Sequence, residues 1–327
     1  MTIRYGIIGC RGFGTTHADA VVNTDGVELV AGANRGEEGA REFAETYDCA
    51  AYTDHVEMIR DADVDAVSVC TPSGTHADIS IDAMEAGADV LCEKPLDTRA
   101  ERMDRMIAAA EEHDATLAGV FHRRTGPGAQ RAKRAVESGE IEELVFGDVA
   151  VKWHRTQGYY DGDEWRGTRE LDGGVLMNQA IHGIDLLQWL AGGVERVNAV
   201  CRTVGRDVEV ETAATVLLEF ENGATGTIQA STVTYPQREV RIELDGEGGA
   251  VQLKNEEIAA FETTDGVVDV PDTESGPGSI DAIVADFVEA LETGREPMIP
   301  ARDARTAVDI VLAAYESSET GEWVDVH

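Results

Sequence analysis

Three polar side chains stand at helical spacing in the segment GGVLMNQAIHGIDLL. Asn178 and His182 are four residues apart and Asp185 follows His182 by three, so an α-helix would place all three on one face. An imidazole titrates near neutral pH and can accept a proton from a hydroxyl group. A single helix histidine is more often a hydrogen-bonded core residue, so the spacing alone leaves both interpretations open.

A glycine-rich turn follows the first apolar run of the chain. The segment GCRGFG places Gly9, Gly12 and Gly14 around Arg11 and Phe13, between a predicted strand and a predicted helix. In this context glycines permit a tight turn, and the helix N-terminus faces the pyrophosphate of a dinucleotide. The match is imperfect, because the consensus has glycine where Arg11 stands. Arg11 is expected to point outward or to place its guanidinium near a phosphate.

The second predicted strand ends in Gly32-Ala33-Asn34-Arg35. Dinucleotide-binding domains commonly carry an acidic residue here, which binds the adenine ribose. Asn34 has no charge that would repel a 2′-phosphate. Arg35 could pair with such a phosphate, stack on the adenine or point to solvent. We therefore predict NAD(P) as cofactor, with NADP slightly favoured.

The elements that must position these residues follow from the hydrophobic pattern. Strand–helix alternation with short loops predicts a parallel, doubly wound α/β sheet in the first 120 residues. The predicted strands are 4–8, 28–33, 66–70, 89–92 and 116–120, and the predicted helices are 36–47, 76–86 and 99–113.

The pattern changes after about residue 122, where period-two strands replace the alternation. We predict two domains, a dinucleotide-binding domain at 1–121 and an α+β domain with an open, largely antiparallel sheet at 122–327. Asn222-Gly223 and Asp245-Gly246 mark tight turns between strands. The second domain is predicted to contain helices 127–138, 174–191, 280–292 and 301–317, and strands 148–154, 213–221, 224–232, 238–245 and 250–253.

The charge of the chain is extreme, with 27 basic and 63 acidic residues and a net charge of −36. Such a surface repels nucleic acid and anionic membranes. The acidic residues are spread evenly and lysine is scarce, which favours a surface adapted to molar salt over an acidic face for a cationic partner. In this respect the composition resembles that of proteins from salt-accumulating microbes.

The remaining composition indicates a cytoplasmic protein. No stretch has the ~20 uncharged apolar residues that cross a bilayer, and the start MTIRYGIIGC enters a strand without the flanks of a signal peptide. The 5 cysteines are scattered and odd in number, and none pairs with another at metal-ligand spacing. They are expected to be reduced core thiols, and no metal site is predicted.

Two further motifs follow the predicted strands 66–70 and 89–92. They are Cys70-Thr71-Pro72, with His76 four residues beyond the proline, and Glu93-Lys94-Pro95. Together with the glycine turn, His17 and the GGVLMNQAIHGIDLL segment, they strongly resemble the glucose–fructose oxidoreductase and inositol dehydrogenase (Gfo/Idh/MocA) family over nearly the whole chain. The resemblance implies a Rossmann domain joined to an open-faced sheet domain, with the active site between them. It also implies a cis bond before Pro95.

The same resemblance implies an oxidoreductase that passes a hydride between a nicotinamide cofactor and a carbinol carbon of a sugar or cyclitol. In this interpretation Lys94 hydrogen-bonds the reacting oxygen and His182 takes the hydroxyl proton. Asn178 replaces the family's more common aspartate and is assigned substrate orientation only. Besides the glycine turn, Asn34 and Arg35, the expected cofactor-binding residues are Cys70, Thr71, Pro72, His76, Glu93 and Lys94.

A long irregular loop precedes the Asn178 helix. Tyr160, Trp165 and Arg166 bring aromatic faces and a guanidinium suited to sugars and phosphates, although packing within the domain explains them equally well. The WRGT…LDGG…LMNQ…IH run resembles the subgroup that oxidises C3 of UDP-linked N-acetylhexosaminuronates, and a free sugar or inositol stays open. Arg124, in HRRTGP, resembles a family arginine and is a further substrate-binding candidate.

Two other functions are compatible with these residues. One is a redox-neutral glycosidase that borrows bound NAD for a transient oxidation, and the other is a cofactor-binding sensor without catalysis. Tightly retained cofactor without net NAD(P)H would mark the glycosidase. The exposed sheet face and the family resemblance predict a homodimer or homotetramer.

Overall fold

The computed structural model describes residues 2–327, which form two compact units. The first unit runs to Phe121 and takes in Ile280–Arg305, and the second comprises His122–Ser279 and Thr306–His327. The predicted domain at 122–327 therefore differs from the second unit, because 280–305 pack with the first. Among the described residues, none of the helices combines the length and apolar character needed to cross a bilayer.

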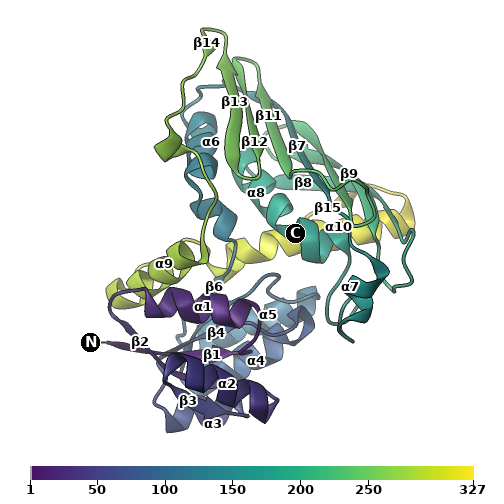
Figure 1. The fold of residues 1–327 in the computed structure, drawn as a ribbon. Coiled ribbons are helices and arrows are strands. Elements are labelled where there is room, and N and C mark those ends of the chain that lie inside the picture. Colours follow the sequence, from purple (N-terminus) through teal and green to yellow (C-terminus); the bar gives the residue numbers. More distant parts are fainter. Residues whose placement is uncertain (1) are drawn as a thin grey trace. The chain divides into compact units, whose positions relative to one another are not determined.

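The first unit is built on a 6-stranded parallel sheet in the order β3-β2-β1-β4-β5-β6 (Figure 1). This order confirms the predicted doubly wound sheet. The short β3 and α3 were not predicted. The strands are β1 (Ile3–Ile8), β2 (Val27–Ala33), β3 (Ala50–Tyr52), β4 (Ala66–Val69), β5 (Asp89–Cys92) and β6 (Leu117–Gly119); the helices between them are α1 (Phe13–Val22), α2 (Glu37–Tyr47), α3 (His55–Asp61), the 3₁₀ turn η1 (Ser73–Thr75), α4 (His76–Glu85) and α5 (Ala100–Glu112).

The strands of this sheet are apolar because helices cover both faces. All four residues of β4 are buried, and its sequence AVSV shows no polar alternation. Such a continuous apolar run is typical of parallel strands, which are buried on both faces. Local signals set the helix boundaries, as where the Asp54 carboxylate accepts the N–H groups of Val56 and Glu57 at the start of α3.

The helix α9 (Ile280–Thr293) belongs to the first unit because its apolar face is buried there. It packs against α1, and the ring of Phe287 meets that of Tyr5 edge-on, with centroids 6.5 Å apart. A further bridge joins Pro300 to Ala118 in β6. An amphipathic helix needs an apolar partner, but the sequence does not say which sheet supplies it, so the predicted boundary missed this return of the chain.

The second unit contains a 9-stranded sheet in the order β14-β13-β12-β11-β7-β10-β9-β8-β15, in which only the β7–β10 pair is parallel. This confirms the predicted open, largely antiparallel sheet, although β8, β13, β14 and β15 were not predicted. The strands are β7 (Leu144–Lys152), β8 (Val194–Arg202), β9 (Ala213–Phe220), β10 (Thr225–Ser231), β11 (Arg241–Gly246), β12 (Gly249–Lys254), β13 (Glu257–Thr263), β14 (Gly266–Val267) and β15 (Val324–Asp325).

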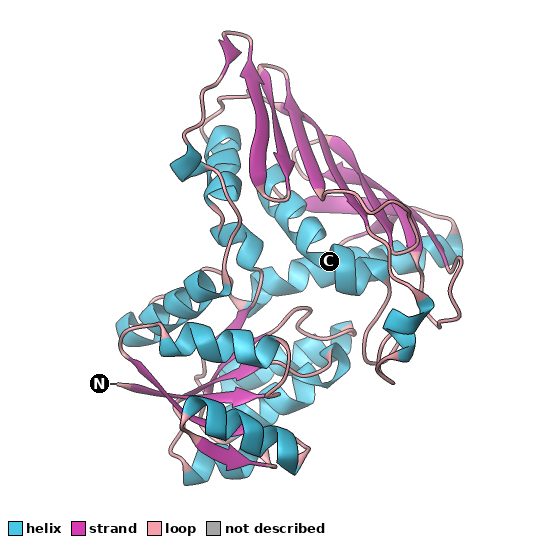
Figure 2. Ribbon diagram, in the orientation of Figure 1, coloured by secondary structure: helices cyan, strands magenta, loops and turns pink. Residues whose placement is uncertain are grey.

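Helices pack on one face of this sheet (Figure 2). α6 (Pro127–Glu137) packs against β12 and β13, and α8 (Ile181–Ala191) packs against β7 and β11. The last helix, α10 (Ala301–Thr320), passes from the first unit into the second after Arg305. In the second unit its Ser317 Oγ accepts the Ala199 N–H of β8 at 3.0 Å. The residues that alternate to the other face of the sheet are exposed or half-buried.

Replacing Phe287 tests whether α9 stabilises the first unit. Phe287→Ala removes a fully buried ring, and such changes cost about 3–5 kcal/mol of unfolding free energy. Denaturant unfolding would measure the loss. Val267→Ala, at a site that is 79% exposed, is the control and should change stability by less than about 0.5 kcal/mol. Equal stability of the two variants would contradict the assignment of α9.

Candidate active site

The predicted cofactor-binding residues of the first unit follow strands that end at one edge of its sheet. Ile8 pairs with both Ala33 and Val69, and Val69 pairs with Cys92, so β1, β2, β4 and β5 finish in register. The carboxyl edge of a doubly wound sheet is the usual place for a ligand. The structure thus gathers Gly9–Gly14, Asn34–Arg35, Cys70–Pro72 and Glu93–Lys94 at this edge.

The glycine turn after β1 leaves no room for side chains at two positions. A Cβ on Gly9 would lie 2.5 Å from the Cys70 carbonyl oxygen, and one on Gly14 would lie 1.9 Å from the Gly9 carbonyl oxygen. Gly9 also has φ +96°, which favours glycine. These contacts explain both glycines, and they bring the start of α1 close to the end of β1.

The N-terminus of α1 suits a phosphate. Its first turn contains no acidic residue, and its N-cap, Gly12, offers no side chain that would occupy the backbone N–H groups. The positive end of a helix dipole favours an anion at this place. Arg11 fits the turn in spite of the consensus because its side chain points outward, 3.9 Å from the Glu42 carboxylate, and Phe13 is also exposed. The turn therefore fits a dinucleotide pyrophosphate.

The end of β2 presents an amide and guanidinium groups where a carboxylate would bind ribose. The Asn34 amide donates to the Gly36 carbonyl oxygen at 3.0 Å. A Cβ on Gly39 would lie 2.8 Å from Asn34 Nδ2 and 3.1 Å from Arg11 Nε, so these two side chains converge beside Gly39. Arg35 is exposed. No acidic side chain occupies position 34, so this end of the strand does not repel a 2′-phosphate.

The turn after β5 carries the candidate Lys94. The Lys94–Pro95 bond is cis, as the family resemblance implied. The Lys94 main-chain N–H donates to Glu93 Oε2 at 3.0 Å. Glu93 is only 6% exposed, so its side chain points into the unit. We therefore assign the Glu93 side chain to holding this turn, and its contact with the cofactor stays a prediction.

His76 joins the turns that follow β4 and β5. Its ring is buried, with Nδ1 2.7 Å from the Pro95 carbonyl oxygen and Nε2 2.8 Å from the Thr71 carbonyl oxygen. Thr75 Oγ1 contacts both Thr71 Oγ1 and the Pro72 carbonyl oxygen. Since both of its nitrogens face main-chain oxygens, the His76 ring is also assigned to holding the turns, and its role in cofactor binding stays a prediction.

In the second unit, the segment that carries Asn178 is not an α-helix. Val175–Ala180 (η3) is π-helical and α8 begins only at Ile181, which differs from the predicted α-helix 174–191. π-Helical turns within α-helices are frequent at functional sites. Asn178 Nδ2 donates to Asp172 Oδ1, and the Gly167 N–H donates to Asp172 Oδ2 at 2.6 Å. An amide suits this place because a second carboxylate beside Asp172 would be repelled.

His182 lies in the first turn of α8 and is 9% exposed. The ring of His122 stands beside it, with centroids 4.8 Å apart and an interplanar angle of 67°. Arg124, two residues further on, donates to both oxygens of Asp185, at 2.9 Å from Nε and 2.5 Å from Nη2. Arg124 and Asp185 are both buried. This bidentate ion pair ties α8 to the start of the unit, so Arg124 holds the helix, and its role in substrate binding stays a prediction.

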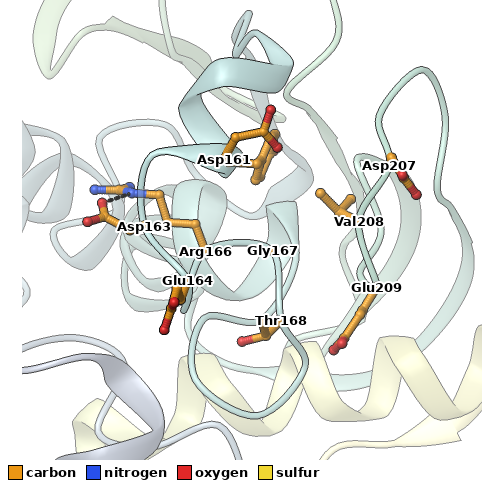
Figure 3. A pocket seen from close by; sticks show the side chains of 10 residues that line it. Asp161, Asp163, Glu164, Arg166, Gly167, Thr168, Asp207, Val208 and Glu209 are labelled. Carbon is orange, nitrogen blue, oxygen red and sulfur yellow. Dashed lines mark hydrogen bonds and ion pairs between the residues drawn. The ribbon is translucent and has the colours of Figure 1, made fainter.

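The loop before η3 and residues 207–209 together line an open pocket of about 260 Å³ (Figure 3). Arg166 Nε binds Asp163 Oδ2 at 2.7 Å, and its guanidinium carbon lies 4.4 Å and 4.6 Å from the ring centroids of Tyr159 and Trp165. Tyr160 is buried and donates its hydroxyl to Thr232 Oγ1 at 2.8 Å, so the predicted sugar-binding phenol is engaged in packing. The acidic residues that line the pocket are Asp161, Asp163, Glu164, Asp207 and Glu209.

Glu211 was missed by the sequence reasoning, although it holds the start of η3. Its Oε1 accepts the Leu176 N–H at 2.9 Å and the Tyr315 hydroxyl at 3.0 Å, and its carbonyl oxygen accepts the Val175 N–H at 3.0 Å. Burial raises the pKa of Glu211 to about 7, against the opposing effect of these hydrogen bonds. Glu211 thus anchors the segment that carries Asn178 and leads to His182.

The signal for this anchor was the glycine pair before η3. A Cβ on Gly174 would lie 1.6 Å from Glu211 Oε2, so only glycine admits the carboxylate, and Gly173 has φ +74°. The pair therefore marked a close approach, but nothing in the sequence identified which residue approaches. Lys94 belongs to the first unit and His182 to the second, and their joint action on one substrate stays a prediction.

Two family descriptions match the chain. Residues 3–121 match "Oxidoreductase family, NAD-binding Rossmann fold", and residues 129–252 match "GFO/IDH/MocA C-terminal domain". Among curated proteins, the chain is 30% identical over 337 residues to myo-inositol 2-dehydrogenase of Thermotoga maritima, covering 97% of this chain and 96% of that protein. It is 30% identical over 328 residues to D-xylose 1-dehydrogenase (NADP(+)) 2 of Haloferax volcanii, covering 98% and 99%.

A solved structure is also similar over the full length. The WlbA dehydrogenase from Bordetella pertussis, in complex with NADH and UDP-GlcNAcA, superimposes with a TM-score of 0.93 at 31% identity. The match covers 100% of this chain and 99% of that one.

The raised pKa of Glu211 predicts a loss of stability with rising pH. Between its ordinary value of 4.5 and its folded value of about 7, the unfolded chain releases the Glu211 proton more readily than the folded chain. The unfolding free energy should therefore fall across this window, by on the order of 3 kcal/mol from this group. In Glu211→Gln that part of the pH dependence should vanish, whereas the exposed Glu262→Gln should keep the wild-type dependence. Denaturant unfolding at pH 5 and pH 8 would measure it, and parallel pH dependences in wild type and Glu211→Gln would contradict the assignment.

Proposed function

Because this chain belongs to the Gfo/Idh/MocA family of oxidoreductases, we propose that it is an NAD(P)-dependent dehydrogenase that oxidises a secondary hydroxyl of a sugar, nucleotide sugar or cyclitol. The observation that carries the proposal is the Glu93-Lys94-Pro95 turn, which stands with the glycine turn at the carboxyl edge of the Rossmann sheet. The relatives described above are named dehydrogenases, which supports neither the glycosidase nor the sensor.

The chemistry requires an oxygen-binding cation and a proton acceptor. Bound NAD(P) supplies the hydride acceptor. The Lys94 ammonium hydrogen-bonds the substrate oxygen and stabilises negative charge as it develops there. A ring nitrogen of His182 accepts the hydroxyl proton. Asn178, tethered by Asp172, orients a neighbouring hydroxyl.

The residues at the end of β2, where the adenine ribose would bind, favour NADP over NAD. The glycine turn and the α1 N-terminus would hold the pyrophosphate, and Arg11, Asn34 and Arg35 would surround the adenine ribose. Support comes from the absence of a carboxylate at position 34 and from the relative named as NADP(+)-dependent.

Two substrate classes compete. Similarity to the WlbA dehydrogenase over the whole chain, together with the WRGT…LDGG…LMNQ…IH run, supports a UDP-linked N-acetylhexosaminuronate. An uncharged sugar or cyclitol is the second candidate, supported by the acidic lining of the pocket in Figure 3 and by the named inositol and xylose dehydrogenases. Five carboxylates beside an arginine that Asp163 already binds would repel a diphosphate in that pocket.

A substrate panel separates these classes. UDP-sugars, free aldoses and inositols would be offered with NAD⁺ or NADP⁺ in about 1 M KCl, where screening over ~3 Å offsets the self-repulsion of a protein with net charge −36. Formation of reduced cofactor would be followed by absorbance. Turnover of UDP-N-acetylhexosaminuronates would support the first class, and turnover of inositol or free sugar alone would overturn it.

Two variants test the roles of Lys94 and His182 with whichever substrate is turned over. Lys94→Ala and His182→Ala should each lower kcat/KM by roughly 10²–10⁴-fold, because each removes a group that acts in the transition state. Lys254→Ala, at an exposed lysine of the second unit, is the matched control and should leave the rate unchanged. Full activity in both active-site variants would contradict the mechanism.

The open sheet face is proposed as the surface that pairs subunits. Val200 and Leu217 are exposed on the β8–β9 pair, and Asn198, opposite Leu217 in the register, shares their face. Light scattering after gel filtration should give a multiple of 35.1 kDa. Leu217→Glu should shift the mass towards the monomer, whereas Val267→Glu on the β14 hairpin should not. A wild-type protein that runs as a monomer would overturn this proposal.

A further inference from the structure

Four buried polar side chains form a hydrogen-bonded network next to the Lys94 turn. The Tyr5 hydroxyl is 2.9 Å from Ser68 Oγ, Ser68 Oγ is 2.9 Å from His17 Nδ1, and His17 Nε2 is 3.2 Å from Glu93 Oε1. The second oxygen of Glu93 accepts the Lys94 main-chain N–H. The four side chains of this network are nearly inaccessible to solvent. They come from β1, α1, β4 and the turn after β5, which are far apart in the sequence.

The hydrogen bonds of this network start from the charge of Glu93. An ionised Glu93 only accepts, so His17 Nε2 donates to it, while His17 Nδ1 shares a hydrogen bond with the Ser68 hydroxyl. The Tyr5 hydroxyl also shares a hydrogen bond with Ser68 Oγ, and burial raises the pKa of Tyr5, so the phenol stays protonated. Each polar side chain of this network therefore has a hydrogen-bond partner, as buried polar groups require.

The charge of Glu93 is stabilised by the same contacts. Burial alone would raise its pKa, but the hydrogen bond from His17 and the electrostatic interactions with His17 and Lys94 more than offset this, and the pKa of Glu93 is lowered. Hydrogen bonds to a charged acceptor are roughly twice as strong as neutral ones. The ionised Glu93 carboxylate thus accepts a hydrogen bond from the Lys94 main-chain N–H inside the unit.

The other side of the turn is held independently. His76 contacts the Pro95 carbonyl oxygen at 2.7 Å, and Asp97 Oδ1 accepts the Thr98 N–H at 2.7 Å while its Oδ2 accepts the Ala77 N–H at 3.3 Å. Glu93 therefore fixes the amino side of Lys94, and groups of α4 and its preceding turn fix the residues after it. A four-carbon side chain is flexible, so the placement of its main chain decides where the ammonium can reach.

We propose that Glu93 and His17 are positioning residues, which act through the Lys94 main chain to hold the Lys94 ammonium at the reacting oxygen. This inference rests on the proposed function of Lys94. Neither Glu93 nor His17 need touch substrate or cofactor, since both are buried. Their loss should lower kcat with little effect on the affinity for reduced dinucleotide. Misplacement of a catalytic group by about 1 Å can cost roughly 10²-fold in rate.

Two variants of Glu93 and one control test the kinetic part. Glu93→Ala removes the acceptor of the Lys94 N–H and should lower kcat by about 30–100-fold, with the Kd for NAD(P)H within about threefold of wild type. Glu93→Gln keeps a carbonyl oxygen for the same N–H and should restore most of the rate. Tyr5→Phe alters only the end of the network that is farthest from Glu93, and its kcat should stay within about twofold of wild type. A Glu93→Ala protein with wild-type kcat would overturn the proposal.

A measurement without substrate tests the geometry. The chain has lysines only at 94, 133, 152 and 254, so selective ¹⁵N-lysine labelling yields four main-chain amide signals. The Lys94 amide should be shifted downfield and protected from hydrogen exchange. In Glu93→Ala it should move upfield and exchange at least tenfold faster, while the other three signals keep their positions and rates.

The two arms separate the possible failures. A wild-type Lys94 amide that exchanges like an unprotected one would overturn the inference without any variant, even if Glu93→Ala fails to fold. A protected amide in a protein that turns over none of the panel would leave the geometry standing and overturn the proposed function. Wild-type activity that persists in Lys94→Ala would overturn the role of Lys94 and, with it, the inference.

Discussion

The contact between the Glu93 carboxylate and the Lys94 main chain is the constraint around which the first unit is organised. A carboxylate enclosed by protein requires hydrogen bonds on both oxygens, and here His17 and the Lys94 N–H supply them. To bring His17 to that place, α1 must lie close against β1 and β4. That closeness in turn requires glycine at position 14, where a Cβ would strike the Gly9 carbonyl oxygen. The glycine turn and the lysine turn therefore depend on one packing arrangement.

In the second unit, too, carboxylates hold a segment of main chain in place. There the segment to be fixed is η3 with the first turn of α8, and Glu211, Asp172 and Asp185 each hold one part of it through hydrogen bonds or an ion pair. The protein has 63 acidic residues, and most of those that the structure describes are at least partly exposed. These three are enclosed, and each is matched by a donor that fixes main chain or an essential side chain. Through their contacts with η3 and α8, these groups hold the segment that carries Asn178 and His182.

Much of the architecture could be predicted from the sequence because it follows from local periodicity. The continuous apolar runs of β1, β4 and β5 and the period-two runs of β9 and β10 identified both sheets, and the glycine turn identified the cofactor edge. The prediction was wrong for 280–305, because an amphipathic helix does not reveal which unit buries it. Short elements such as β3 and β15 have too few residues to show a period. The π-helical turn was missed because its residues have ordinary α-helical spacing.

Side-chain roles were less predictable than elements. His76, Glu93 and Arg124 were recognised as important by their motifs, but the sequence could not show that their polar atoms turn inward. Glu211 belongs to no motif. The one sequence feature related to its position is Gly174, which leaves room for the Glu211 carboxylate. A motif therefore indicated which residues matter, whereas contacts distant in sequence show which neighbours each of them holds.

Isotope tracing shows whether the hydrogen of the carbinol carbon passes to the nicotinamide as a hydride. The substrate identified by turnover would carry deuterium on the carbon that is oxidised, and the reduced cofactor would be isolated and analysed by mass spectrometry. For hydride transfer, we expect one deuterium in each molecule of reduced nicotinamide formed, and none in the oxidised product at that carbon. Deuterium released to water, or returned to a sugar product without net cofactor reduction, would contradict it.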